Sequence, residues 1–190
     1  MSAQAEAGPG PEPAWVEDVL GFWFGLPHAC WWHKDAAFDR GVRARFLALH
    51  EALRAEPAPA LASPRAALAA VIVLDQFSRN MFRDDPRAYA SDALARGIAF
   101  AAIDAGWDAD MPREARLFLY MPLEHSEDLA DQHRAVALIG ALGDPEWTHF
   151  AEAHRRVIAR FGRFPHRNAI LGRVSSAEED ASLHEPMGRF

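Results

Sequence analysis

Cysteine and long apolar runs are both nearly missing from this sequence. Its one cysteine, Cys30, excludes a disulfide within the chain and indicates a reducing compartment. The flanking Trp31 and Trp32 make a small buried hydrophobic side chain the expected role of Cys30. The longest apolar run, residues 66–74, is far shorter than the roughly 20 residues that cross a bilayer. The sequence therefore predicts neither a disulfide framework nor a membrane span.

Basic residues are fewer than acidic residues, 20 against 27. The 190 residues carry a formal net charge of −7, which disfavours nucleic-acid binding through phosphates. Residues 1–13 are rich in Ala, Gly, Pro and Glu and lack the basic and apolar regions of a signal peptide. We therefore predict a disordered tail over residues 1–13 and a cytoplasmic protein that binds no membrane and no nucleic acid.

Strand alternation is nearly absent, and helical periodicity takes its place. Between Phe38 and Leu53, for example, apolar residues recur every three or four positions. Prolines, glycines and capping pairs such as Ser63-Pro64 divide this pattern into seven to nine helices with short connections. Half of the residues are hydrophobic, enough for a sizeable core. We predict an all-α fold of antiparallel helical hairpins, in a single domain over residues 14–190.

Several helix ends can be predicted from capping signals. Pro122 is expected to interrupt a helix that starts near Pro112, and Ser126 to cap its continuation. Residues 87–105 are predicted to form one helix. Ser175 and Glu178 have the spacing of a capping box for a last short helix.

The first of three polar segments, residues 75–80, lies in the most apolar helix. Asp75 and Arg79 are four residues apart on one helical face, as are Gln76 and Asn80. Arg79 could hold an anion while Asp75 orients the guanidinium. The alternative is an ion pair that closes a buried helix end and binds nothing.

The second polar segment, residues 120–127, begins a series of carboxylates at helical spacing. Glu124 and Glu127 are followed by Asp128 and Asp131. Carboxylates so close together raise one another's pKa, which is how general acids arise. They could also hold a hard cation, although calcium-loop spacing is absent. The alternative is electrostatic capping of a helix start, together with pairing to the arginines of the third segment.

Histidines accompany these carboxylates. His125 and His154 both lie on apolar helical faces, where a histidine is usually part of the core. We expect His154 to be buried and structural. Glu124 and His125 are the candidate acid–base pair. The sequence contains no His-Glu-x-x-His and no Cys/His cluster, so we predict no metal site and no cofactor.

The third polar segment, residues 160–168, is the densest. Arg163, His166, Arg167 and Asn168 crowd a turn around Pro165. Loops with this many donors often bind phosphate or carboxylate. If the loop edge is exposed, Arg167 is expected to bind a ligand at little cost in stability. If Arg167 is buried and its removal unfolds the chain, the loop is a structural clasp.

At these segments the sequence resembles an uncharacterised bacterial family, domain of unknown function 924. The resemblance rests on Leu-Asp-Gln-Phe-Ser-Arg-Asn at residues 74–80, Tyr-Met-Pro-Leu-Glu-His-Ser-Glu at 120–127 and Arg-Phe-Gly-Arg-Phe-Pro-His-Arg-Asn at 160–168. It covers roughly residues 15–183 and is looser beyond residue 179. The resemblance implies a tetratricopeptide-like helical array, although the repeat signature itself is not visible. It implies no activity.

Three functions are therefore open. The first is a protein that binds a small anionic molecule, or an acidic group of a peptide, in a polar pocket where the three segments meet. The second is a hydrolase or isomerase that uses Glu124 or His125 for acid–base chemistry. The third is a scaffold without a small ligand. The predicted binding residues are those that concentrate in the three segments: Asp75, Arg79, Asn80, Glu124, His125, Arg163, His166, Arg167 and Asn168.

Overall fold

The computed structural model describes residues 12–188, and within this range it is helical without any β-strand. The α-helices, in chain order, are α1 (Ala14–Phe24), α2 (Ala36–Ala55), α3 (Pro64–Val71), α4 (Ser78–Met81), α5 (Asp92–Asp104), α6 (Arg113–Glu124), α7 (Leu129–Gly140), α8 (Pro145–Phe161) and α9 (Ala177–Ser182). The predicted all-α fold is confirmed. The predicted tail, residues 1–13, lies outside the described residues except for Glu12 and Pro13.

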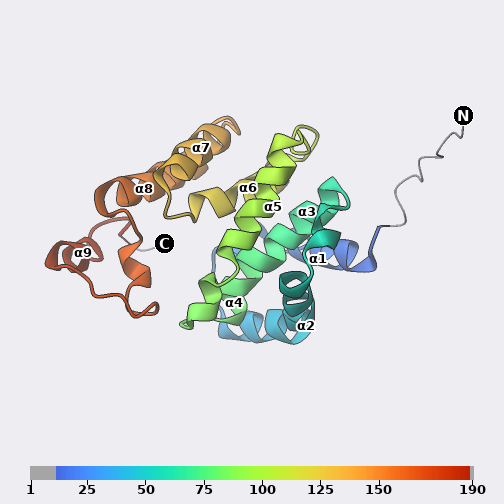
Figure 1. Ribbon diagram of the computed structural model, residues 1–190, viewed down its shortest axis with the longest axis horizontal. Helices are drawn as coiled ribbons and strands as arrows, with labels where there is room; N and C mark the ends of the chain where they lie inside the picture. The colour runs from blue at the N-terminus through green and yellow to red at the C-terminus, as the bar shows by residue number, and fades with distance from the viewer. Residues whose placement is uncertain (1–11, 189–190) are drawn as a thin grey trace, which may run out of the picture.

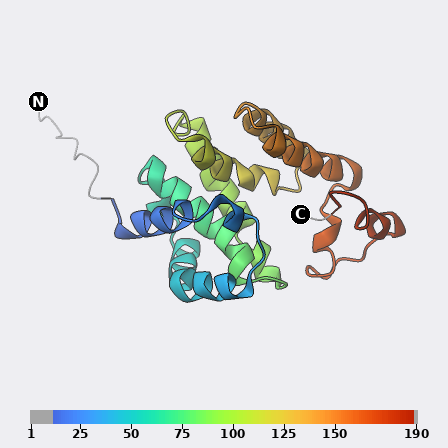
Figure 2. The same cartoon turned by 180° about the vertical axis from the view of Figure 1, so that it is seen from behind.

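Successive helices pack beside one another along the molecule. α2 contacts α4, α3 contacts α5, α5 contacts α6, and α7 packs against both α6 and α8. Figures 1 and 2 show α1 and α2 on one side of α3 and α4, with α7, α8 and α9 toward the opposite end and α5 and α6 between them. Neighbours in the chain are therefore mostly neighbours in space, as in helical hairpins.

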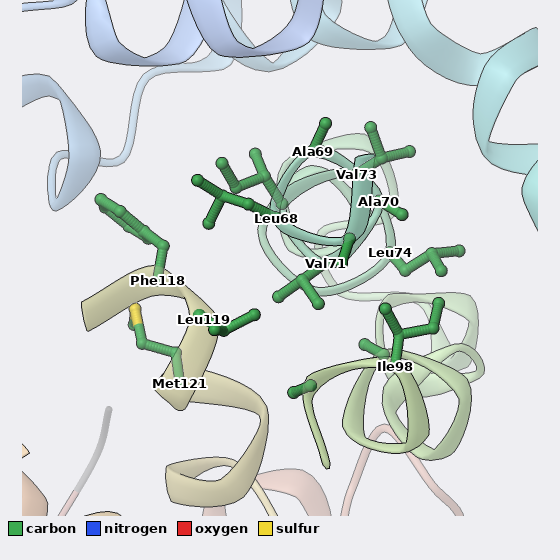
Figure 3. Packing of buried hydrophobic residues seen from close by; sticks show 14 of the residues in the cluster. Leu68, Ala69, Ala70, Val71, Val73, Leu74, Ile98, Phe118, Leu119 and Met121 are labelled. Carbon is green, nitrogen blue, oxygen red and sulfur yellow. The ribbon is translucent and has the colours of Figure 1, made fainter. Parts of the chain in front are cut away.

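α3 is the centre of the core because its residues are apolar on every side. Six of its eight residues, from Ala66 to Val71, are at most 4% exposed. Figure 3 looks along this helix and shows Leu68, Val71 and Leu74 pointing in different directions, with Ile98 of α5 and Phe118 of α6 close by. A helix that is hydrophobic all round requires partners on all sides. The other helices supply them.

The central helix continues past α3 in an unusual form. Ile72–Phe77 is a π-helix, and α4 follows it directly. A π-helix has a wider turn than an α-helix and is frequent at functional sites. The first polar segment begins within this turn, so Asp75 and Gln76 lie deep in the molecule, at 0% and 7% exposure.

Four predicted helix boundaries are wrong. Pro122 lies inside α6 and does not end it. Asp128 caps α7, accepting hydrogen bonds from two backbone N–H groups, and Ser126 does not. The expected helix over residues 87–105 divides into a 3₁₀ turn, Pro86–Tyr89, and α5. The capping box of α9 is formed by Ser176 and Glu179, one residue later than predicted.

Gly162 marks the end of α8 within the third polar segment. This residue ends α8 with φ 68°, in the left-handed region that favours glycine. The 3₁₀ turn Pro165–Arg167 follows immediately. Its position is fixed by Phe164, whose side chain is fully buried and whose N–H donates to Glu127 Oε1 at 2.8 Å. The second and third polar segments therefore meet.

None of the helices described between residues 12 and 188 combines the length and the apolarity needed to cross a bilayer.

Candidate functional site

A pocket of about 350 Å³ lies between the start of α5, the connection from α6 to α7, and the turn Pro165–Arg167. Its apolar lining residues include Pro86, Tyr89, Ala93, Pro122 and Leu171. Its charged and other polar lining residues are Asp92, Arg96, His125, Ser126, Glu127 and Arg167. Its volume lies within the usual range of small-molecule sites.

The π-helix supports this pocket from behind. The carbonyl of Leu74 accepts hydrogen bonds from the hydroxyls of Ser78 and Ser91, both at 2.8 Å. These bonds tie the start of α5 to the central helix. Asp75, the next residue, is fully buried and reaches toward α6.

Asp75 holds His125 at the wall of the pocket. Nδ1 of His125 lies 2.9 Å from both carboxylate oxygens of Asp75. Arg79 and Gln76 also bond to this carboxylate, at 3.0 and 2.6 Å. Burial alone would raise the pKa of Asp75, but the charge of Arg79 and the hydrogen bond from His125 outweigh burial and hold that pKa far below its usual value. Asp75 is therefore a carboxylate at neutral pH.

His125 is neutral at the same pH. Burial lowers the pKa of its imidazole below 6.5, the nearby Arg79 guanidinium lowers it further, and Asp75 only partly opposes them. A neutral imidazole has one N–H and one lone pair. With Nδ1 facing a carboxylate, the N–H belongs on Nδ1 and the lone pair on Nε2.

A second chain of charges starts from the same aspartate. Arg79 bridges Asp75 to Asp92, donating to both Asp92 oxygens at 3.0 and 3.1 Å. Arg167 lies on the other side of Asp92, with Nη1 at 3.4 Å from Oδ2. Two guanidinium groups thus share the Asp92 carboxylate, and Arg79 makes the shorter bonds.

Arg167 is the most unusual residue of the site. Its side chain is 7% exposed and lies between two aromatic rings, 4.7 Å from the Tyr89 centroid and 4.4 Å from that of Phe164. Its Nε is buried without a hydrogen-bond partner among the described residues. Burial and the charge of Arg79 lower the pKa of Arg167 to about 10, so the side chain remains a cation. The pocket is therefore lined by a buried positive charge with donors to spare.

Two further ion pairs form the rim. Arg173 donates to both oxygens of Glu127, at 2.7 and 2.9 Å. Burial favours a higher pKa for Glu127, but the bonds from Arg173 and from the Phe164 N–H hold the pKa below its usual value. Arg96 donates to Ser126 and Asp131 at 2.9 and 2.8 Å. These charges are compensated within the chain.

Two predicted residues lie near the pocket without lining it. Glu124 is buried and pairs with Nδ1 of His154 at 3.1 Å, so it does not form an acid–base pair with His125. His154 is 6% exposed and also contacts the Phe150 carbonyl at 2.9 Å, in the buried position that was expected. His166 packs against Phe164, and burial together with Arg167 lowers the pKa of His166 to about 3.

Three other predicted residues belong to separate contacts. Asn80 donates to Asp39 of α2 at 2.8 Å. Arg163 forms a bidentate pair with Glu179 of α9, at 2.6 and 2.8 Å. Asn168 is 1% exposed and donates to Ser175 at 3.1 Å. Of the nine predicted binding residues, His125 and Arg167 line the pocket, while Asp75 and Arg79 position groups that do.

Tyr89, Asp92 and Arg96 are among the pocket residues that were not predicted. They follow one another at spacings of three and four, which is a helical face. Tyr89 and Asp92 directly flank the break between the 3₁₀ turn and α5. This spacing was the available signal. The sequence analysis predicts one helix over residues 87–105 and assigns no site residue to it.

Metal-binding geometry does not occur in the described part of the chain, where no three His, Cys, Asp or Glu side chains gather closely enough to hold an ion. The carboxylates of the pocket are instead paired with arginines.

The fold is that of an all-helical protein, with parts of its polar segments gathered at one pocket. The chain belongs to the family described as bacterial protein of unknown function (DUF924), whose model matches residues 19–187. The solved structure of a protein of unknown function from Agrobacterium tumefaciens is similar, with 42% identity and a TM-score of 0.86. The similarity covers 91% of this chain and 98% of that one. No curated protein matches the chain.

Proposed function

We propose that this protein binds a small anionic molecule in the pocket between α5, the α6–α7 connection and the turn Pro165–Arg167. The observation that carries the proposal is Arg167. It is a buried cation on the pocket wall, it shares its one carboxylate with Arg79, and its Nε has no partner in the described chain. Buried hydrogen-bond donors are almost always paired, and an anion bound beside Arg167 would accept the hydrogen bond that its Nε–H lacks.

The shape of the pocket supports a ligand with two parts. A guanidinium fork suits the oxygens of a carboxylate or a phosphate. The apolar lining residues, which include Pro86, Tyr89 and Leu171, suit a small apolar body. Asp92 and Glu127 add negative charge to the lining, although both are neutralised by arginines. A ligand with one anionic group therefore fits better than a polyanion.

Arg167 is buried, so the exposed loop edge expected for a binding arginine is not found and one of the two conditions for a structural clasp is met. The clasp is nevertheless less consistent with how Arg167 is bonded. Arg163, in the same segment, illustrates such a clasp, because it makes two short bonds to Glu179 and a third to the Val174 carbonyl at 2.9 Å. Arg167 makes one bond at 3.4 Å. A clasp has little reason to bury an arginine and leave its donors unused.

Replacement of Arg167 tests the proposal. We expect inorganic phosphate, acetate or succinate to raise the melting temperature of the native protein at constant ionic strength, because a ligand of the folded state stabilises it. Arg167→Ala removes charge-assisted hydrogen bonds worth about 1.5–3 kcal/mol each. The variant should therefore bind the same anion at least about tenfold more weakly by titration calorimetry.

Arg163→Ala is the matched control, since it removes a guanidinium from the same segment outside the pocket. It should leave the anion affinity unchanged. If Arg167→Ala does not fold, Arg167→Lys takes its place, because lysine keeps the charge and loses the fork. Equal affinities for the native protein, Arg163→Ala and Arg167→Lys would contradict the proposal.

A further inference from the structure

His125 reaches the pocket with one ring nitrogen engaged behind it. Nδ1 faces the two oxygens of Asp75, each at 2.9 Å, and the residue itself lines the pocket. No hydrogen bond to its Nε2 occurs within residues 12–188. Nε2 is therefore the nitrogen available to a bound molecule.

His50 is a purely structural histidine of this chain. It is 1% exposed, and its Nε2 contacts the hydroxyls of Ser78 and Ser91 at 2.9 and 3.3 Å. Its second ring nitrogen, Nδ1, also lacks a hydrogen bond but is enclosed in the protein. It does not line the pocket. His50 ties three elements together, whereas the polar contacts of His125 all lie on the Asp75 side of its ring.

We propose that Asp75 and His125 form a proton-accepting dyad that acts on the molecule bound beside Arg167. This inference rests on the proposed anion site. Asp75 is the positioning residue, because it holds the proton on Nδ1 and directs the lone pair of Nε2 to the opposite side of the ring. Arg167 lines the same pocket and would hold the anionic group of the substrate.

The chemistry is a single proton transfer. An O–H or C–H bond next to the anionic group of the ligand breaks, and its electron pair stays on the ligand atom. The proton forms a new N–H bond at Nε2. The resulting imidazolium is stabilised by the Asp75 carboxylate, which remains ionised. The substrate class is thus a small carboxylate or phosphate that carries a removable proton next to its anionic group.

The geometry also keeps the base ready at neutral pH. Burial and Arg79 lower the pKa of His125, so the lone pair on Nε2 is not already protonated. Asp75 cannot take this role itself, since it is fully buried and bonded to Arg79, Gln76 and His125.

Diethyl pyrocarbonate tests whether Nε2 carries a lone pair toward the pocket. The nitrogen attacks a carbonyl carbon of the reagent, gains one ethoxycarbonyl group, and carbon dioxide and ethanol leave. We expect mass spectrometry to find His125 modified in the folded protein, and saturating inorganic phosphate to slow this modification several-fold. The exposed His149 serves as the internal control and should react equally with and without phosphate.

The role of Asp75 has its own readout. Nitrogen-15 NMR of the imidazoles at pH 7 should show His125 with its proton on Nδ1, and Asp75→Asn should change that tautomer and slow the modification. The NMR measurement on the native protein needs no variant, so it determines the tautomer of His125 even if Asp75→Asn does not fold. A proton on Nε2, or an unreactive His125 in a protein that binds phosphate, would overturn the dyad and leave the anion site standing. Phosphate that binds through Arg167 without protecting His125 would also overturn it.

Discussion

Each charge of the site has an oppositely charged neighbour, either four residues away or in another part of the chain. Asp75 pairs with Arg79 and faces His125, and Asp92 connects Arg79 to Arg167. Buried ions are costly unless they are paired and hydrogen-bonded. The least satisfied member of the network, Arg167, is also the one that lines the pocket. Such a distribution is typical of binding sites, where a donor is reserved for the ligand.

At the residue scale we predict that stability falls as the pH falls from 6.5 to 5. Buried His166 has a pKa of about 3 in the folded chain, against 6.5 for an ordinary histidine, and the pKa of His125 is also lowered. Between these values the unfolded chain binds more protons, so acid favours unfolding. Each such histidine contributes a slope of up to about 1.4 kcal/mol per pH unit, measurable by urea unfolding.

The slope is attributed to His166 by substitution. Burial is the largest cause of the low pKa of His166. The nearby basic side chains also disfavour its protonation, and they are Arg167, His154, Arg79 and His125. His166→Gln should flatten the dependence by about one proton, while His149→Gln, at an exposed position, should not. An unchanged slope in His166→Gln would show that His166 is not kept neutral by the fold.

At the scale of elements, the helix limits that could be predicted were those marked by local sequence signals. Caps such as Ser63 and Asp144 and the glycine end at Gly162 determine helix limits within a few residues, and the sequence displays them. The π-helix has no comparable signature. The Leu74 carbonyl within it accepts a local bond from Ser78 and a tertiary bond from Ser91, and the tertiary bond depends on where α5 packs. Pro122 was misjudged for a related reason, since the packing of α6 outweighs a local break.

Charge partners were the least predictable part of the site. Glu124 and Arg163 both lie in segments rich in opposite charge, yet they pair with His154 and Glu179, which no spacing rule connects to them. Partner choice depends on where the turn Pro165–Arg167 and α9 pack, and that is a property of the tertiary structure. The segments could be identified from sequence, and the pairing inside them could not.

A single glutamine should control the connection from α6 to α7. Gln132 is fully buried, and its amide donates to the carbonyls of Glu124 and Ser126, at the end of α6 beside the pocket. Gln132→Ala leaves these acceptors unpaired, at about 1–3 kcal/mol for a buried group. We expect the free energy of unfolding to drop by about 2 kcal/mol and the affinity for inorganic phosphate to fall.

His133→Ala is the comparison for this prediction. His133 is the next residue of α7 and is exposed, so its removal should change stability by less than about 0.5 kcal/mol. Similar losses in the two variants, measured by urea unfolding, would indicate that the Gln132 amide does not hold the connection.

At the scale of the whole molecule, we predict that residues 14–190 unfold as one unit. Contacts run without a break from α1 through α3, α5, α6 and α7 to α8, and the charges of the site connect residue 75 to residue 167. Calorimetry should therefore show one transition with equal calorimetric and van't Hoff enthalpies. Two transitions, or far-ultraviolet and near-ultraviolet circular dichroism curves that do not coincide, would instead indicate two domains.

Arg167 comes from a late part of the chain, and this has a consequence during protein synthesis. The central helix, α5 and α6 leave the ribosome well before the turn Pro165–Arg167 emerges. Until then Asp92 has only Arg79 as a cationic partner among its described contacts, and the pocket has no wall on that side. A nascent chain can therefore bury its core first and complete the proposed anion site only after the turn Pro165–Arg167 has emerged.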